Sequence, residues 1–319
     1  MSIVYVYIDR TMKTINLYIV DMSHASNTSG VDRYVGTLIG GLKAFSNVKI
    51  HWIHLRNDTT LLFPKEEVIE HYIKYTIPLP QQYNTIIAER FWIRKYNEQV
   101  YRLTKHLFEG KDNCVIHLHT LNLIDLAVCI KEHIECKVVT HLHCIPWKAL
   151  YNSNKKRFNK LYELTYTDNA IIEKAKPEMY VTNNCELQSY TVTDALVCVT
   201  QCAVDFLDNC IQSYSDNTHI IPNGIGDLVN EMDRCYVKEN GDLFHCLYVG
   251  VVTESKGIMY ILKALNIVRK KGYNVKLTVA GSCSSTFRQV VKQKFSDIEV
   301  DIKGVIPFSE LKELYAECD

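Results

Sequence analysis

Short apolar runs alternate with amphipathic segments along this chain, and the pattern is clearest between residues 244 and 281. There, an apolar run at 247–249 ends at Gly250, a polar loop covers 253–256, and apolar residues then recur at helical spacing. A second apolar run at 275–280 ends at Gly281. A short apolar run, a loop, an amphipathic helix and another short apolar run are typical of a βαβ unit with parallel strands.

The rest of the chain has a similar rhythm. Strands are expected at 15–20, 48–55 and 298–302, a strand or a strand-to-helix passage at 192–200, and within 218–225 a short strand that ends in a Pro-Asn-Gly turn. Helices are expected at 31–42, 91–108, 154–174, 287–295 and 307–315. Residues 59–82 include three prolines and are expected to be irregular. A chain of 319 residues is long enough for two domains. We therefore predict two Rossmann-like α/β domains, at 1–215 and 216–319.

Two loops of this pattern are candidate anion sites. Lys256 and Gly257 lie where the helix of the βαβ unit begins, and Ser29 and Gly30 lie just before the first expected helix. Ligands of open α/β sheets bind at the carboxyl ends of the strands, and helix N-termini there attract phosphate. An ordinary loop with a solvated lysine, or a flexible Ser-Gly connection, explains the same residues without a ligand.

Two His-x-His pairs each follow an apolar run. They are His117 with His119, and His141 with His143. Residues i and i+2 of a strand share a face, so each pair could direct two imidazoles to one place. A metal-hydrolase site is one interpretation, but no acidic residue follows either pair at the usual spacing, and we predict no metal site. Structural hydrogen bonds at the strand ends are a second interpretation.

Composition narrows the choice of function. Lys plus Arg and Asp plus Glu number 36 each, so the net charge is zero, which argues against a general nucleic-acid binder. The 12 cysteines include no Cys-x-x-Cys pair and are expected to be reduced, as in a cytoplasmic protein. No apolar run is long enough for a membrane span, although the basic stretch at 155–160 leaves peripheral membrane contact open.

The region around Lys256 resembles the start of the second domain of family 4 glycosyltransferases, which have the GT-B fold. Their pattern is a strand, Gly-Arg, a short loop, Lys-Gly, a helix and a strand that ends in Gly. Gly250, Lys256, Gly257 and Gly281 match in order and spacing, whereas Val251 stands in place of the Arg. The tripeptide at 222–224 matches the Pro-Asn-Gly of the family's domain junction.

The resemblance implies a retaining transfer of a sugar from a nucleotide-sugar donor to an unidentified glycan, lipid-linked or peptide acceptor, in a cleft between two domains. It implies that Lys256 holds the donor diphosphate and that His143 contacts the transferred sugar. No further cofactor is expected. The other residues that it places at the donor are Gly30, His119, Asn223, Gly250 and Gly257. Trp147 is expected either to form an aromatic wall beside the sugar or to pack in the core.

The family's carboxylates that hold the donor sugar would follow residue 319, so the resemblance implies an incomplete second domain. Two alternatives to a transferase therefore stay open. One is a non-catalytic nucleotide-binding chain or partner subunit of GT-B fold, which Val251 favours. The other is a GT-B sugar-nucleotide epimerase, for which the expected acidic and basic cleft residues are not apparent.

Overall fold

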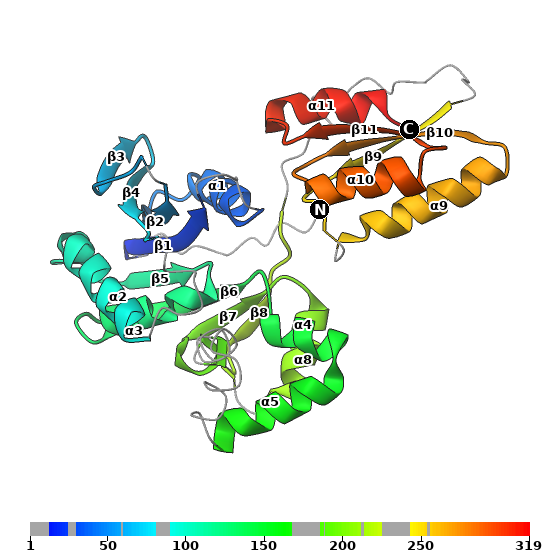
Figure 1. Ribbon diagram of the computed structural model, residues 1–319. Helices are drawn as coiled ribbons and strands as arrows, with labels where there is room; N and C mark the ends of the chain where they lie inside the picture. Colours follow the sequence, from blue (N-terminus) through cyan, green and yellow to red (C-terminus); the bar gives the residue numbers. More distant parts are fainter. Residues whose placement is uncertain are drawn as a thin grey trace. The chain divides into compact units, whose positions relative to one another are not determined.

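The chain divides into two compact units, Met1–Gly226 (unit 1) and Asp227–Asp319 (unit 2). This computed structural model describes residues 13–24, 30–58, 60–80, 90–167, 186–187, 189–211, 214–224, 243–253 and 256–319 (Figure 1). Each unit contains its own sheet. None of the helices in the described ranges is both long and apolar enough to cross a membrane.

Unit 1 is built on an eight-stranded sheet with the order β3-β4-β2-β1-β5-β6-β7-β8. Every neighbouring pair is parallel except β3 and β4. The strands are β1 Ile15–His24, β2 Val48–Asn57, β3 Lys65–Ile69, β4 Tyr72–Pro78, β5 Cys114–Leu118, β6 Cys136–Leu142, β7 Ala195–Cys198 and β8 Thr218–Ile220. This order brings the carboxyl ends of β1, β2, β5 and β6 side by side.

Helices cover both faces of this sheet because buried side chains alternate along its strands. Ile19 packs with α1, whereas Tyr18 and Val20 pack on the opposite face with α2 and α3. The α-helices of unit 1 are α1 Gly30–Leu42, α2 Arg90–Thr104, α3 Ile124–Lys131, α4 Pro146–Ser153, α5 Lys155–Thr167 and α8 Gln201–Cys210. Short 3-10 turns occupy Lys105–Leu107 and Leu121–Leu123. Helices α4, α5 and α8 share a separate cluster with β6 and β7.

The region at 59–82 differs from the sequence expectation. It contains an antiparallel hairpin of β3 and β4 instead of an irregular excursion, and Tyr75, Thr76 and Ile77 of β4 are buried. Two of its prolines explain why the strands are possible, since Pro64 precedes β3 and Pro78 ends β4. A proline at a strand end removes no hydrogen bond from the middle of the sheet.

Unit 2 confirms the predicted βαβ unit and extends it. Its parallel sheet has the order β11-β10-β9. Helices α9 and α10 pack on one face, around Leu262 and Leu277, and α11 packs on the other, against Ala280. The elements are β9 Leu243–Val249, α9 Ile258–Lys270, β10 Asn274–Ala280, α10 Ser285–Lys294, β11 Glu299–Gly304 and α11 Phe308–Glu317.

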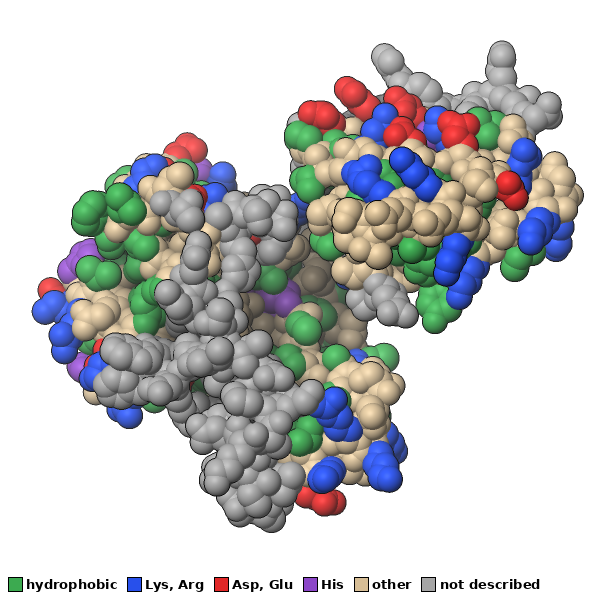
Figure 2. Space-filling model, viewed as in Figure 1, with side chains coloured by type: hydrophobic (Ala, Val, Ile, Leu, Met, Phe, Trp, Pro, Cys, Tyr) green, Lys and Arg blue, Asp and Glu red, His purple; other side chains and the backbone are tan. Residues whose placement is uncertain are grey.

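The boundary between the two units along the chain differs from the one expected from the sequence. β8 pairs with β7, so residues 218–220 belong to the sheet of unit 1. The compact units separate after Gly226, whereas the sequence analysis assigned residues 216–226 to the second domain. On the face shown in Figure 2, unit 2 carries Lys and Arg side chains together with Asp and Glu side chains.

A close approach between two glycines fixes the carboxyl edge of the sheet in unit 2. Gly281 has φ +154°, and a Cβ on it would lie 1.8 Å from the carbonyl oxygen of Gly250. The backbone N–H of Gly250 also donates to the carbonyl of Ala280 at 2.9 Å. Gly281 therefore lets the ends of β9 and β10 meet.

Gly281→Ala should destabilise unit 2 because the added methyl group must push the end of β9 away. We expect it to cost about 1–3 kcal/mol more in free energy of unfolding than Gly272→Ala, measured in urea. Gly272 is the matched control, since its φ is also positive, at +94°, but a Cβ there meets nothing within 4 Å. Equal decreases in the free energy of unfolding for Gly281→Ala and Gly272→Ala would show that the close approach of Gly281 to Gly250 has no effect on stability.

Candidate functional site

Four imidazoles lie side by side at the carboxyl ends of β5 and β6. The two strands are parallel with His117 opposite Val139, which places His119 beside His141. Ring centroids are 4.2 Å apart for His117 and His119, and 4.3 Å apart for His141 and His143. Across the strands, His119 lies 5.3 Å from each ring of the second pair. We call these four residues the histidine ladder.

Contacts within unit 1 hold the rings of the histidine ladder. Nδ1 of His119 and Nε2 of His143 are 3.0 Å apart and share a hydrogen bond. The ring of Tyr34, from α1, contacts His141 and His143 with centroid distances of 4.7 and 4.9 Å. Helix α1 begins at Gly30, which is exposed. Three of the predicted site residues, Gly30, His119 and His143, therefore lie in the same unit. Residues 25–29 before it lie outside the described part.

Burial keeps the histidine ladder uncharged near neutral pH. Loss of hydration lowers the pKa of His117 and His143 to about 4 and that of His141 to about 3. The pKa of His119 is lowered as well, by burial first and then by its three neighbours. These side chains can therefore donate or accept hydrogen bonds and coordinate metals, but they do not supply a positive charge at pH 7.

A second polar network occupies the ends of β1 and β2. Oδ1 of Asp21 accepts hydrogen bonds from Nε1 of Trp52 at 2.8 Å and Nδ1 of His54 at 2.7 Å, and Oγ of Ser23 lies 3.0 Å from Nε2 of His54. The order matches a Ser-His-Asp triad. Ser23 is only 7% exposed, which leaves its hydroxyl little access to a substrate. The network fixes the His54 ring and was not predicted from the sequence.

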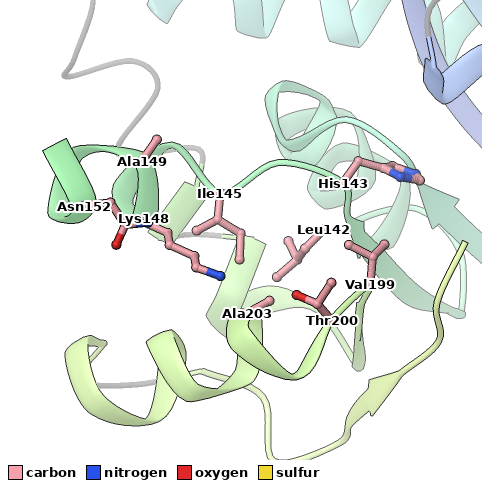
Figure 3. A pocket seen from close by; sticks show the side chains of 9 residues that line it. All are labelled: Leu142, His143, Ile145, Lys148, Ala149, Asn152, Val199, Thr200 and Ala203. Atoms are coloured by element: carbon pink, nitrogen blue, oxygen red, sulfur yellow. The ribbon is translucent and has the colours of Figure 1, made fainter. Parts of the chain in front are cut away.

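A cavity of about 260 Å³ lies beside the backbone of His143, between α4 and the first turn of α8. In Figure 3 the imidazole of His143 points away from this cavity, whereas the amino group of Lys148 points into it. The lining residues are Leu142, His143, Ile145, Lys148, Ala149, Asn152, Val199, Thr200 and Ala203. The cavity thus combines an apolar wall with one cationic side chain.

Trp147 lies next to this cavity but belongs to the core. It is 1% exposed, and its ring makes edge contacts with Phe158 and Tyr162 at centroid distances of 5.5 and 5.6 Å. Its backbone N–H donates to both carboxyl oxygens of buried Glu186, at 3.2 and 3.1 Å, and the Tyr190 hydroxyl donates to the same carboxyl. Of the two expectations for Trp147, the structure therefore supports core packing.

The buried Glu186 should make unit 1 less stable at alkaline pH. Burial raises the pKa of Glu186 from 4.5 to about 8, so the folded chain holds a proton that the unfolded chain releases. The contribution of this group is complete below pH 4.5 and is lost as the pH rises towards 8.

The expected result is a fall of a few kcal/mol in free energy of unfolding between pH 5 and pH 8, measured in urea. Glu186→Gln should remove most of that fall, because an amide does not titrate in this range. Glu135→Gln, which removes an exposed carboxyl from the same unit, is the control and should leave the pH dependence unchanged. The same slope in wild-type chain and Glu186→Gln would contradict a protonated carboxyl.

The predicted residues of unit 2 share one loop. β9 ends at Val249, Gly250 follows, and Lys256 and Gly257 lie directly before α9. Gly257 has φ +77°, a conformation that favours glycine, and its carbonyl accepts the N–H groups of Tyr260 and Ile261. Lys256 is exposed, and no side chain of the described residues caps α9. The loop thus presents a cation beside an open helix N-terminus; residues 254–255 lie outside the described part.

The remaining predicted residue, Asn223, is exposed three residues after β8 and belongs to unit 1. The structure therefore brings His119 and His143 together, and it places Gly250, Lys256 and Gly257 in a loop of the other unit. Within the described ranges no hydrogen bond joins Asn223 to either group.

Neither a scan against protein-family models nor a search of curated proteins finds a match. Solved structures do match, over most of this chain. A sucrose-phosphate synthase from Thermosynechococcus elongatus shares 14% identity with a TM-score of 0.62, covering 95% of this chain and 74% of that one. The E. coli trehalose-6-phosphate structure bound with UDP-2-fluoro glucose shares 13% identity with a TM-score of 0.59, covering 95% and 77%.

A UDP-forming α,α-trehalose-phosphate synthase from Burkholderia vietnamiensis gives 12% identity and a TM-score of 0.58, covering 94% of this chain and 76% of that one. The predicted GT-B fold is confirmed. At these identities the similarity establishes the fold and not the reaction. The chain spans about three quarters of the length of these structures.

Proposed function

We propose that this chain is a glycosyltransferase that transfers a sugar from a nucleotide-sugar donor to an acceptor. The observation that carries the proposal is the position of Lys256 at the open N-terminus of α9, at the carboxyl end of a strand in a GT-B fold. The similar structures are named as synthases of sugar phosphates, and one of them holds UDP-2-fluoro glucose. The spacing of Gly250, Lys256 and Gly257 supports membership of family 4.

Unit 2 would bind the donor diphosphate. When the sugar–oxygen bond breaks, negative charge grows on the departing phosphate oxygens. The Lys256 ammonium and the N-terminus of α9 supply positive charge at the place where that charge develops, which is usually the largest contribution to catalysis of this kind. Val251 stands where the family has an Arg that would add a second cation. Lys256 would therefore stabilise the departing diphosphate without that second charge.

His143 would contact the transferred sugar, as the resemblance to family 4 implies. Because its imidazole is neutral, the side chain acts as a hydrogen-bonding group and not as a cation. The hydrogen bond with His119 orients the ring. We expect retention at the anomeric carbon, as in the family that the sequence resembles.

The acceptor would bind on the side of unit 1, and the cavity beside His143 is a candidate for part of its site. Lys148 gives that cavity a cationic group suited to an acidic acceptor. We place the protein in the cytoplasm, because its 12 cysteines are scattered, with no Cys-x-x-Cys pair, as in a protein of a reducing compartment.

A second candidate function is nucleotide binding without turnover. Val251 favours it, since this exposed side chain cannot neutralise a leaving diphosphate. The two candidates agree on the loop at Lys256 and differ only in whether the bound donor is consumed.

Thermal unfolding with a panel of UDP-, GDP- and ADP-sugars tests the donor site, since a ligand that binds only the folded chain raises its midpoint. One nucleotide class should shift the midpoint of the wild-type chain and fail to shift that of Lys256→Ala. No shift with any class would reject both candidate functions. A shift that survives in Lys256→Ala would reject the assigned site.

A further inference from the structure

We propose that three members of the histidine ladder, His117, His119 and His141, bind one transition-metal ion. Each offers a ring nitrogen, and these nitrogens all lie within 4.8 Å of one another. The site lies wholly within unit 1 and comes from two adjacent strand ends. It goes beyond the proposed sugar transfer, which uses no metal.

The strongest observation is a set of buried ring nitrogens without protein partners. His119 is 3% exposed and His141 is 1% exposed. Among the described residues, nothing hydrogen-bonds to Nε2 of His117, Nε2 of His119 or either nitrogen of His141. Buried polar atoms nearly always have partners, because leaving them unpaired costs free energy. A metal ion would give one nitrogen of each residue a partner.

The ring geometry requires only a small adjustment. Zn²⁺ binds imidazole nitrogen at about 2.0–2.1 Å, so nitrogens around a tetrahedral ion lie about 3.4 Å apart. The observed limit of 4.8 Å is wider than that. Rotation of the rings about χ2, a torsion with broad minima, would bring the nitrogens together.

His143 would act as the supporting residue of this site. Its Nε2 shares a hydrogen bond with Nδ1 of His119, so Nε2 of His119 is the nitrogen left to face the ion. Metal-bound histidines commonly use their other ring nitrogen in this way, which fixes the tautomer and the ring orientation.

The donor set indicates the class of metal. Three imidazoles without a carboxylate suit Zn²⁺, Co²⁺, Ni²⁺ or Cu²⁺ and do not suit Mg²⁺ or Ca²⁺, which prefer oxygen ligands. Three protein ligands would leave one position of a tetrahedral ion for water or another small ligand.

Titration with Co²⁺, in the presence of a phosphine reductant and without any nucleotide sugar, tests the site. We expect visible d–d bands that saturate at one Co²⁺ per chain, without the near-ultraviolet charge-transfer band of a thiolate ligand. His117→Gln and His141→Gln should each weaken binding more than tenfold, and His143→Ala should weaken it by about 10–100-fold. Circular dichroism establishes that each variant is folded.

His133→Ala is the matched control. His133, Cys129 and Glu132 form another cluster of possible ligands within 4.8 Å of one another, away from the ladder. This variant should bind Co²⁺ like the wild-type chain. A thiolate band, equal affinity in wild-type chain and His143→Ala, loss of binding in His133→Ala, or no visible band at all would each overturn the proposal. Because no sugar nucleotide is present, these outcomes are independent of the proposed transfer.

Discussion

Replacing Lys256 with alanine should lower the rate of nucleoside-diphosphate release from the donor by about 10²–10³-fold. The exposed ammonium lies at the start of α9, where the N-terminal end of the helix dipole favours the same negative charge. Removing it leaves the helix N-terminus alone to stabilise the departing diphosphate. The measurement is the steady-state release of diphosphate from the nucleotide sugar that the panel selects.

Lys270→Ala is the matched control for this prediction. Lys270 lies in the last turn of the same helix, is also exposed and carries the same charge. At a rise of about 1.5 Å per residue it is roughly 20 Å from Lys256. We expect its rate to stay within about twofold of wild type, because exposed charges that far apart are screened by salt. Equal losses in both variants would mean that the effect comes from net charge and not from the loop.

His143→Ala should lower the rate of sugar transfer by about 10²–10³-fold while leaving the affinity for the free nucleoside diphosphate unchanged. The imidazole is proposed to contact the sugar and not the phosphates. Its removal should therefore affect only the binding and reaction of ligands that carry a sugar. The comparison requires the rate with the nucleotide sugar and the dissociation constant of the diphosphate alone.

His133→Ala serves as the control here as well, because His133 is an exposed histidine of unit 1 outside the histidine ladder; its ring bonds to the carbonyl of Cys129 and contacts the ring of Tyr101. It should keep the wild-type rate. A His143→Ala chain that transfers sugar at the wild-type rate would remove His143 from the site. A matching loss of affinity for the diphosphate would place His143 at the phosphates instead.

The sequence predicts the fold well where strands are buried on both faces. β1 and β10 are mostly apolar, since parallel strands that pack against helices on both faces bury both sets of side chains. The hairpin of β3 and β4 was missed for the opposite reason. β3 is an edge strand with four of its five residues exposed, so its composition resembles that of a loop.

The candidate site was predictable where its geometry is local. The i, i+2 spacing of each His-x-His pair places both rings on one face, and the structure confirms this arrangement at β5 and β6. The pairing of His119 with His143 depends on the register between the two strands, which one sequence does not reveal.

The partners of Asp21 and Glu186 were not predicted because they lie far away along the chain. Asp21 meets His54 only through the pairing of β1 with β2. Glu186 meets the backbone of Trp147, 39 residues earlier, with no motif around either residue to indicate the contact. One signal in the sequence was the position of Asp21, Ser23 and His54 near the carboxyl ends of β1 and β2, after or between apolar residues.

The most direct test of the account compares the dissociation constants of a nucleoside diphosphate and of its nucleotide sugar for the wild-type chain, Lys256→Ala and His143→Ala. If the chain binds a sugar donor as proposed, Lys256→Ala weakens both ligands by a similar factor, and His143→Ala weakens only the nucleotide sugar. If wild-type chain binds neither ligand, or if both variants bind both ligands as wild type does, the chain is not a glycosyltransferase that uses these residues.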